Sequence, residues 1–139
     1  MPNTDSAGFE ILDDEECYAL LVSTSLGRVA VSVEALPAIF PVTFALIDRQ
    51  VVFSTGLGTK LSAALAGRVV GFEADWVAAD GRAAWSVQLV GMSMVVESGS
   101  DMEAAALVAV HALAPVPRRF LVKVRPFRIS GRRLPPLQP

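Results

Sequence analysis

Apolar and polar residues alternate with a period of two in several segments, and this alternation restricts the fold more than any other feature. Residues 29–33 and 40–47 alternate in this way, and the pattern is cleanest over 68–77. Successive side chains of a β-strand point to opposite faces, so these segments predict strands with one buried face. Residues 85–97 are apolar at both parities, which predicts a strand covered on both faces. A mainly β chain is therefore expected.

Short helical segments are expected between the strands. Asp13 and Glu16 have capping-box spacing, which predicts a helix that begins there and ends near Gly27. Residues 61–66 are rich in alanine and predict a second short helix, and residues 101–114 predict a third.

Turns and one irregularity complete the pattern. Leu36-Pro37, residues 48–50 and residues 79–81 predict turns. In the last strand, which begins at Phe120, the apolar positions change parity after Pro126. Proline cannot donate a ladder hydrogen bond, and a slip of one residue is what a β-bulge produces. Six strands with short helices at the connections predict a small antiparallel barrel, closed to avoid exposed edges. The six expected strands are residues 29–33, 40–47, 51–55, 68–77, 85–97 and those from 120 onward.

Length and composition indicate one domain. The chain has 139 residues, of which 53% are apolar, and its mean hydropathy is +0.49. No apolar run reaches the ~20 residues of a spanning helix, so no membrane association is expected. An apolar fraction this high predicts that a second chain covers part of the surface. Residues 1–11 are expected to form a flexible leader, 12–134 the domain, and 135–139 a C-terminal tail.

Charge is distributed unevenly along the chain. The first twenty residues carry six acids, whereas seven of the twelve basic residues lie from Arg118 onward. These basic residues alternate with apolar strand residues and lack exposed aromatic neighbours, so nucleic-acid binding is not expected. A single cysteine, Cys17, excludes an internal disulfide and fits a reducing cytoplasm. The first nine residues lack the features of a secretion signal, so the expected location is cytoplasmic.

Residues 55–60 form a glycine-rich segment that could bind an anion. Its small residues expose backbone N–H groups, its two threonines add hydroxyl donors, and Lys60 adds a positive charge before a helix. The segment matches neither the GxxxxGK[ST] phosphate loop nor the GxGxxG dinucleotide fingerprint. A phosphate site and an ordinary turn both remain open from this pattern.

The sequence lacks the residue combinations that usually form metal sites or catalytic nucleophiles. One histidine, His111, and one cysteine exclude a Cys/His metal site, and no GxSxG nucleophile motif occurs. Trp76 and Trp85 fit core or interface positions, or contact with a planar cofactor. A chain of this kind is expected to borrow a cofactor for its chemistry.

Several short stretches, taken in order, resemble the pyridoxamine 5'-phosphate oxidase-like flavoproteins. They extend from about Leu12 to Leu134, which is nearly the whole chain. The stretches are residues 12–21, 26–31, 40–44, 52–55, 58–61, 70–75, 85–87 and 129–133. The resemblance implies an FMN-binding split barrel and a homodimer with two flavins at the subunit interface.

The resemblance also implies which residues surround the flavin. The edge of the isoalloxazine ring would be lined by Pro41, Val42, Thr43, Phe53, Ser54 and Thr55. The phosphate would be bound by Thr59 and Lys60, with Leu61 adjacent. The partner chain would contribute Trp85 and Ser86, with Arg132 or Arg133 near the phosphate or the ribityl chain.

The implied function is that of an FMN-dependent oxidoreductase acting on a small molecule of unassigned class. Vitamin B6 oxidation is not expected, because the basic residues with which the true oxidases hold pyridoxamine phosphate have no match here. Two alternatives stay open: an F420-dependent reductase or binding protein on the same fold, and a non-enzymatic flavin-binding module. Haem is disfavoured because His111 is the only histidine.

Overall fold

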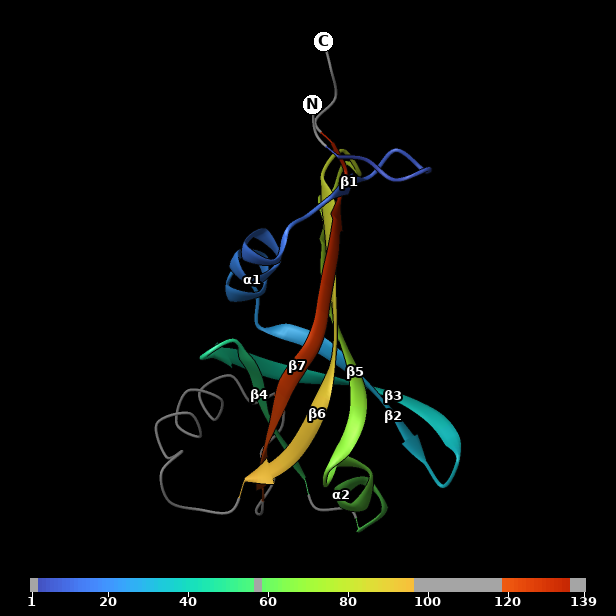
Figure 1. Cartoon of the computed structure of the whole chain (residues 1–139), viewed down its shortest axis with the longest axis vertical. Coiled ribbons are helices and arrows are strands. Elements are labelled where there is room, and N and C mark those ends of the chain that lie inside the picture. The colour runs from blue at the N-terminus through green and yellow to red at the C-terminus, as the bar shows by residue number, and fades with distance from the viewer. Residues whose placement is uncertain (1–2, 57–58, 97–118, 136–139) are drawn as a thin grey trace.

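The computed structural model describes residues 3–56, 59–96 and 119–135. Its described strands form one antiparallel sheet in the order β1-β7-β4-β3-β2-β5-β6, and an additional β6–β7 pairing closes the sheet into a ring (Figure 1). The elements are β1 (Glu10–Ile11), α1 (Asp14–Val22), β2 (Leu26–Val33), β3 (Leu36–Ile47), β4 (Gln50–Gly56), α2 (Thr59–Leu65), β5 (Arg68–Val77), β6 (Ala84–Val96) and β7 (Arg119–Arg133).

The expected fold class is confirmed: the protein is mainly β, with six long antiparallel strands in a split-barrel arrangement and short helices beside them. A seventh, two-residue strand was not expected. Glu10 and Ile11, the last residues of the expected leader, form β1 and pair with Arg133 and Arg132 at the end of β7. The predicted helix over residues 101–114, with His111, lies outside the described residues.

The first helix begins where the capping box predicts. The Glu16 N–H donates to Asp13 Oδ1 at 2.9 Å, and the Asp13 N–H donates to Glu16 Oε2 at 3.2 Å. The helix ends at Val22, earlier than expected, and Gly27 lies within β2 instead. A Cβ at Gly27 would collide with the ring of Phe72, so this glycine provides space for core packing rather than a helix stop.

Two tight turns set the register of β2, β3 and β4. Glu34-Ala35 and Asp48-Arg49 are the two-residue turns, and all four residues have positive φ, as a type I′ hairpin turn requires. The turn expected at Leu36-Pro37 is therefore wrong, since Leu36 pairs with Val33 and begins β3. Pro37 is tolerated there because β4 pairs with β3 only from Phe44 onward.

The predicted bulge in the last strand is confirmed. Val90 of β6 pairs with Arg128, but the next residue, Gly91, pairs with Pro126, so Phe127 has no counterpart on β6. Gly91 is required at this point, because a Cβ there would overlap the backbone carbonyl of Arg125.

Within the described residues only one face of β6 is buried in the core, although the sequence predicts that both faces are covered. Val87 and Leu89 lie in the core, with exposed fractions of 0% and 1%. On the opposite face, Val90 and Met92 are half-buried and Met94 is exposed. In the part of the chain that the structure describes, β6 therefore keeps an apolar outer face that is only partly buried.

Candidate functional site

The residues assigned to the flavin fall into two groups within one chain. The first, which we name the β3–β4–α2 group, comprises Pro41–Thr43 on β3, Phe53–Thr55 on β4 and Thr59–Leu61 at the start of α2. The second, the β6–β7 group, comprises Trp85, Ser86, Arg132 and Arg133, which the strand register places opposite one another: Trp85 with Arg133 and Ser86 with Arg132. Figure 1 shows β1, which pairs with this end of β7, and α2 at opposite ends of the long axis.

Within the first group, burial separates side chains that can reach a ligand from those that cannot. Val42 and Phe53 point into the core, with exposed fractions of 5% and 0%, so only their backbone could contact a flavin. Pro41, Thr43 and Ser54 have the opposite parity and lie outside the core. The sequence pattern alone contained this distinction, because Val42 and Phe53 occupy the apolar positions of their strands.

The helix α2 is held in place by a buried serine on β6. The Ser93 hydroxyl lies 2.8 Å from the Leu65 carbonyl oxygen and 3.0 Å from that of Arg68, and the Gly67 N–H donates to the Ser93 carbonyl at 2.9 Å. The end of α2 is thereby fixed to the sheet, which positions its first residues as well. Sequence reasoning missed Ser93, since one serine in a long apolar strand gives no signal of its own.

The two arginines of the β6–β7 group are paired with the acidic N-terminal segment. Arg132 Nε donates to Asp5 Oδ2 at 3.1 Å. Arg133 donates to both carboxylate oxygens of Glu10, at 3.1 and 3.0 Å, and lies 4.0 Å from Glu16 Oε1. These hydrogen bonds are the largest cause of a lowered pKa at Glu10. The six acids of the first twenty residues could have signalled this pairing.

A small polar cavity adjoins these arginines. It has a volume of about 180 Å³ and is lined by Ser86, Gln88, Ser130, Gly131 and Arg132. Hydroxyl, amide and guanidinium groups meet in it, so it offers hydrogen-bond donors to an anionic or carbonyl oxygen.

A second cavity, of about 320 Å³, lies next to it on the outer face of the sheet and shares Gln88. Ile39, with an exposed fraction of 72%, and Val90 give it an apolar wall. Arg28 lies at its side, where Nη1 contacts Glu73 Oε2 at 3.1 Å and Asp75 Oδ1 at 3.3 Å. Burial, followed by the neighbouring Asp75, raises the pKa of Glu73.

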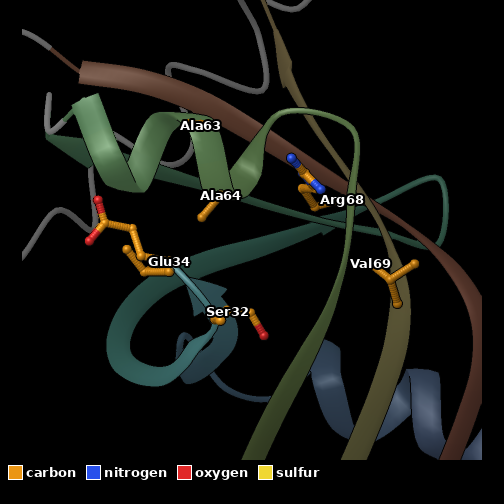
Figure 2. A pocket seen from close by; sticks show the side chains of 8 residues that line it. Ser32, Glu34, Ala63, Ala64, Arg68 and Val69 are labelled. Atoms are coloured by element: carbon orange, nitrogen blue, oxygen red, sulfur yellow. The ribbon is translucent and has the colours of Figure 1, made fainter.

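A larger cavity lies beside α2 and was not predicted from the sequence. It has a volume of about 690 Å³ and includes Ser32, Glu34 and Arg68 among its lining residues (Figure 2). The short alanine-rich helix was visible in the sequence, but not that its small side chains would border an open space.

Other reactive groups are inert or absent in the described part of the chain. Burial raises the pKa of the Cys17 thiol to about 11, so this side chain stays protonated. Among residues 3–56, 59–96 and 119–135 there is no cluster of three metal-ligating side chains. The described helices include none long and apolar enough to cross a membrane.

Comparison with known proteins decides the family. A family model described as pyridoxamine 5'-phosphate oxidase matches residues 13–133. The chain belongs to this family. The resemblance seen in the sequence is thus confirmed, and the match covers both groups of assigned residues.

Individual proteins are similar to this chain over most of its length. An uncharacterised protein of Mycobacterium tuberculosis is 35% identical over an alignment of 130 residues, and the match covers 88% of this chain and 84% of that protein. The structure of an FAD-binding protein from Mycobacterium smegmatis is 35% identical, covers 90% of this chain and 99% of its own, and has a TM-score of 0.72. A Corynebacterium glutamicum protein provisionally named pyridoxamine 5'-phosphate oxidase is 29% identical, covers 100% and 99%, and has a TM-score of 0.81.

Proposed function

We propose that this member of the pyridoxamine 5'-phosphate oxidase family binds a flavin between two copies of the chain. The observation that carries the proposal is that α2, which begins with Thr59 and Lys60, lies at the opposite end of the long axis from β1, which pairs with Arg132 and Arg133 of β7 (Figure 1). A two-fold partner presents the same surface in reverse, so its β6–β7 group would complete the site that the first chain begins. The FAD-binding relative, at 35% identity, supports a flavin as the ligand.

The exposed outer face supports a homodimer. Ile39, Val69 and Met94 have exposed fractions of 72%, 58% and 40%, and they lie on strands β3, β5 and β6 of one continuous sheet. An apolar surface spread over neighbouring strands is typical of a permanent interface between subunits. A second copy of the chain would bury the apolar outer face of β6.

The side chains outside the core fit a flavin. Thr43 and Ser54 carry hydroxyl groups on neighbouring strands, where they could exchange hydrogen bonds with the polar edge of an isoalloxazine ring. Pro41 adds an apolar surface that excludes water from the same edge. The resemblance assigns Thr59 and Lys60 to the phosphate. A bound flavin supplies hydride or electron transfer, and the chain supplies binding and orientation.

The identity of the cofactor is tested by purification and titration. We expect the purified protein to contain FMN or FAD, identified by absorbance and mass spectrometry, and the stripped protein to take up either in preference to F420. Lys60→Ala should weaken FMN binding by roughly tenfold, the loss of one charge-assisted hydrogen bond. Arg82→Ala, which removes a charge in the β5–β6 turn, is the control. A protein that binds no flavin would refute the proposal.

The reaction is tested separately. An oxidoreductase that acts on a small molecule requires the bound flavin to be reduced by NAD(P)H or reduced F420 and reoxidised by a second substrate. Stopped-flow absorbance of the bound flavin measures both steps. A flavin that neither donor reduces would leave a non-enzymatic flavin-binding module as the function.

A further inference from the structure

The two arginines of the β6–β7 group are already bound by carboxylates of their own chain. Glu10 accepts hydrogen bonds from Nε and Nη2 of Arg133 with its two oxygens, at 3.1 and 3.0 Å, and Asp5 Oδ2 accepts one from Arg132 Nε at 3.1 Å. Arginine binds a phosphate through two parallel N–H donors of this kind. On Arg133, the edge formed by Nε and Nη2 is therefore occupied by Glu10.

The N-terminal segment that carries these carboxylates, residues 3–11, is folded on itself. The Asp5 N–H donates to the Phe9 carbonyl at 2.8 Å. Asp5 Oδ1 accepts hydrogen bonds from the N–H groups of Ala7 and Phe9, at 2.9 and 3.0 Å, and this leaves Oδ2 for Arg132. The segment thus fixes the Asp5 carboxylate in the orientation in which it meets the arginine.

The N-terminal segment is attached to the rest of the protein mainly through polar contacts. None of residues 3–10 is buried, and Asp5 and Glu10 are the two that are half-buried rather than exposed. The attachment depends on their ion pairs and on the two-residue pairing of β1 with β7, at one end of the long axis (Figure 1). Segments with few buried apolar contacts open at a low cost in free energy. This segment can therefore leave the arginines without unfolding the core.

The local charge opposes an anion while the N-terminal segment is in place. Asp5, Glu10 and Glu16, whose Oε1 lies 4.0 Å from Arg133 Nη2, set three carboxylates against the two guanidinium groups of Arg132 and Arg133. A phosphate would meet an excess of negative charge there, and like charges at short range repel. When the segment leaves, Glu16 on α1 remains and the positive charge of the arginines is in excess.

We propose that the N-terminal segment is an autoinhibitory contact. Its carboxylates occupy Arg132 and Arg133, and the phosphate of a flavin held by the β3–β4–α2 group of the partner chain must displace them. This inference rests on the proposed flavin site and adds regulation to it. Because the segment and the phosphate use the same guanidinium groups, the segment weakens flavin binding, and flavin binding in turn loosens the segment.

The first test compares the affinities of the stripped full-length protein for FMN and for riboflavin, which lacks the phosphate, by quenching of flavin fluorescence. Glu10→Gln and Asp5→Asn should each bind FMN roughly tenfold more tightly than the wild type, because each releases a guanidinium group from a charge-assisted hydrogen bond. Riboflavin binding should not change. Glu15→Gln is the matched control: it removes one negative charge from the same region, but its partner, Arg49, lies in the turn between β3 and β4.

The second test needs no variant. Hydrogen exchange of residues 3–11 is measured in the wild-type protein at pH 7, with and without FMN. FMN should lower the protection of this segment, because its phosphate takes the place of the carboxylates. Protection that FMN leaves unchanged or increases would overturn the inference.

The outcomes separate this inference from the proposal beneath it. FMN affinity that is unchanged or lower in either variant would show that the carboxylates hold or position the arginines, and would overturn the inference, as would an equal gain for riboflavin. In each of these cases the wild type still binds a flavin and the flavin proposal stands. Binding of neither flavin by the wild type would overturn the flavin proposal and the inference with it. Circular dichroism of each variant checks that the fold is intact.

Discussion

On β3 and β4, a side chain that lies outside the core and could contact a ligand stands directly next to one that is buried in the core. Thr43 lies outside the core, whereas Val42 beside it has an exposed fraction of 5%. The same holds for Ser54 and the fully buried Phe53. Because strand side chains alternate between faces, a contact assigned to Val42 or Phe53 must be made by the backbone, and substitutions there would act on stability first.

Gly91 is expected to tolerate no side chain. Gly91→Ala should lower the free energy of unfolding by about 2–3 kcal/mol or more, because the new Cβ would overlap backbone atoms of Arg125 and Pro126, which cannot rotate away. Gly71→Ala is the matched control, since its Cβ would lie 3.5 Å from that of Ala30, an ordinary contact. Urea denaturation measures both variants, and an equal effect would contradict the packing at the bulge.

At the scale of elements, short segments are held to the sheet by a few polar contacts each. Helix α1 is fixed by its capping box, and the Asp48-Arg49 turn is held to it by an ion pair between Arg49 and Glu15 and by Arg49 over the ring of Tyr18. Helix α2 depends on Ser93, and β1 on the arginines of β7. The contacts of Ser93 and of the β7 arginines therefore hold α2 and the N-terminal segment beside residues assigned to the ligand.

Ser93→Ala should destabilise the protein by about 1–3 kcal/mol, because the buried carbonyl of Leu65 and the partly buried carbonyl of Arg68 would lose their hydroxyl partner. It should also weaken flavin binding through the displaced helix α2. Ser23→Ala provides the comparison: its hydroxyl also donates to a backbone carbonyl, that of Leu20, but at an exposed site. Thermal unfolding and flavin titration measure the two variants, and an equal loss in both would remove the positioning role from Ser93.

Acid should detach the N-terminal segment from β7. Hydrogen bonds from Arg133 lower the pKa of Glu10, and a backbone hydrogen bond from Phe9, with the Arg132 contact, lowers that of Asp5. A lowered pKa means that the ionised form is favoured in the folded state. Its contribution is therefore complete above pH about 4.5, the ordinary value for glutamate, and is lost as the pH falls through the lowered pKa.

Hydrogen exchange of residues 3–11 checks this at pH 7 and at about pH 3. Faster exchange in this segment than in β6 is expected only at the lower pH. Asp5→Asn combined with Glu10→Gln should produce the same local change at pH 7, because both arginines would lose their charged partners. Rates are compared after division by the intrinsic exchange rate at each pH, and protection that is the same at both pH values would show that the segment is held by other contacts.

The sequence predicted the strands well because alternation is a local property, and Pro126 marked the bulge for the same reason. It failed at Glu34-Ala35, where positive φ occurs without glycine or asparagine to signal it. The acidic N-terminal segment and the basic tail were apparent, but not that Asp5 in particular would reach Arg132, because that pair joins distant parts of the chain. The cavity beside α2 was invisible for a related reason: its walls come from three separate segments.

At the scale of the whole molecule, α2 and the end of β7 that pairs with β1 lie at opposite ends of the long axis (Figure 1). A flavin site formed by α2 of one chain and the β6–β7 group of another therefore requires the proposed homodimer. The apolar outer face, with Ile39 exposed at 72%, is the surface through which the partner would arrive.

Ile39→Glu should raise the dissociation constant of the dimer by at least about a hundredfold, because a charge without a partner would be buried in the interface. Val22→Glu is the control. It replaces an apolar residue that is similarly exposed, at 69%, but lies at the end of α1. Sedimentation velocity reports the mass of both variants. A wild-type monomer, or a dimer that both variants leave intact, would refute this interface.

The single extra residue at the bulge in β7 changes which residues of the strand face the core. Before it, the inward positions have even numbers, as at Val122 and Val124; after it, they have odd numbers, as at Gly131. Arg132 faces outward only because Phe127 has been inserted between these halves. Since Phe127 is itself 58% exposed, the chain constrains the presence of this residue far more than its chemistry. Related chains should therefore vary freely in residue type here, yet keep the spacing to the arginines.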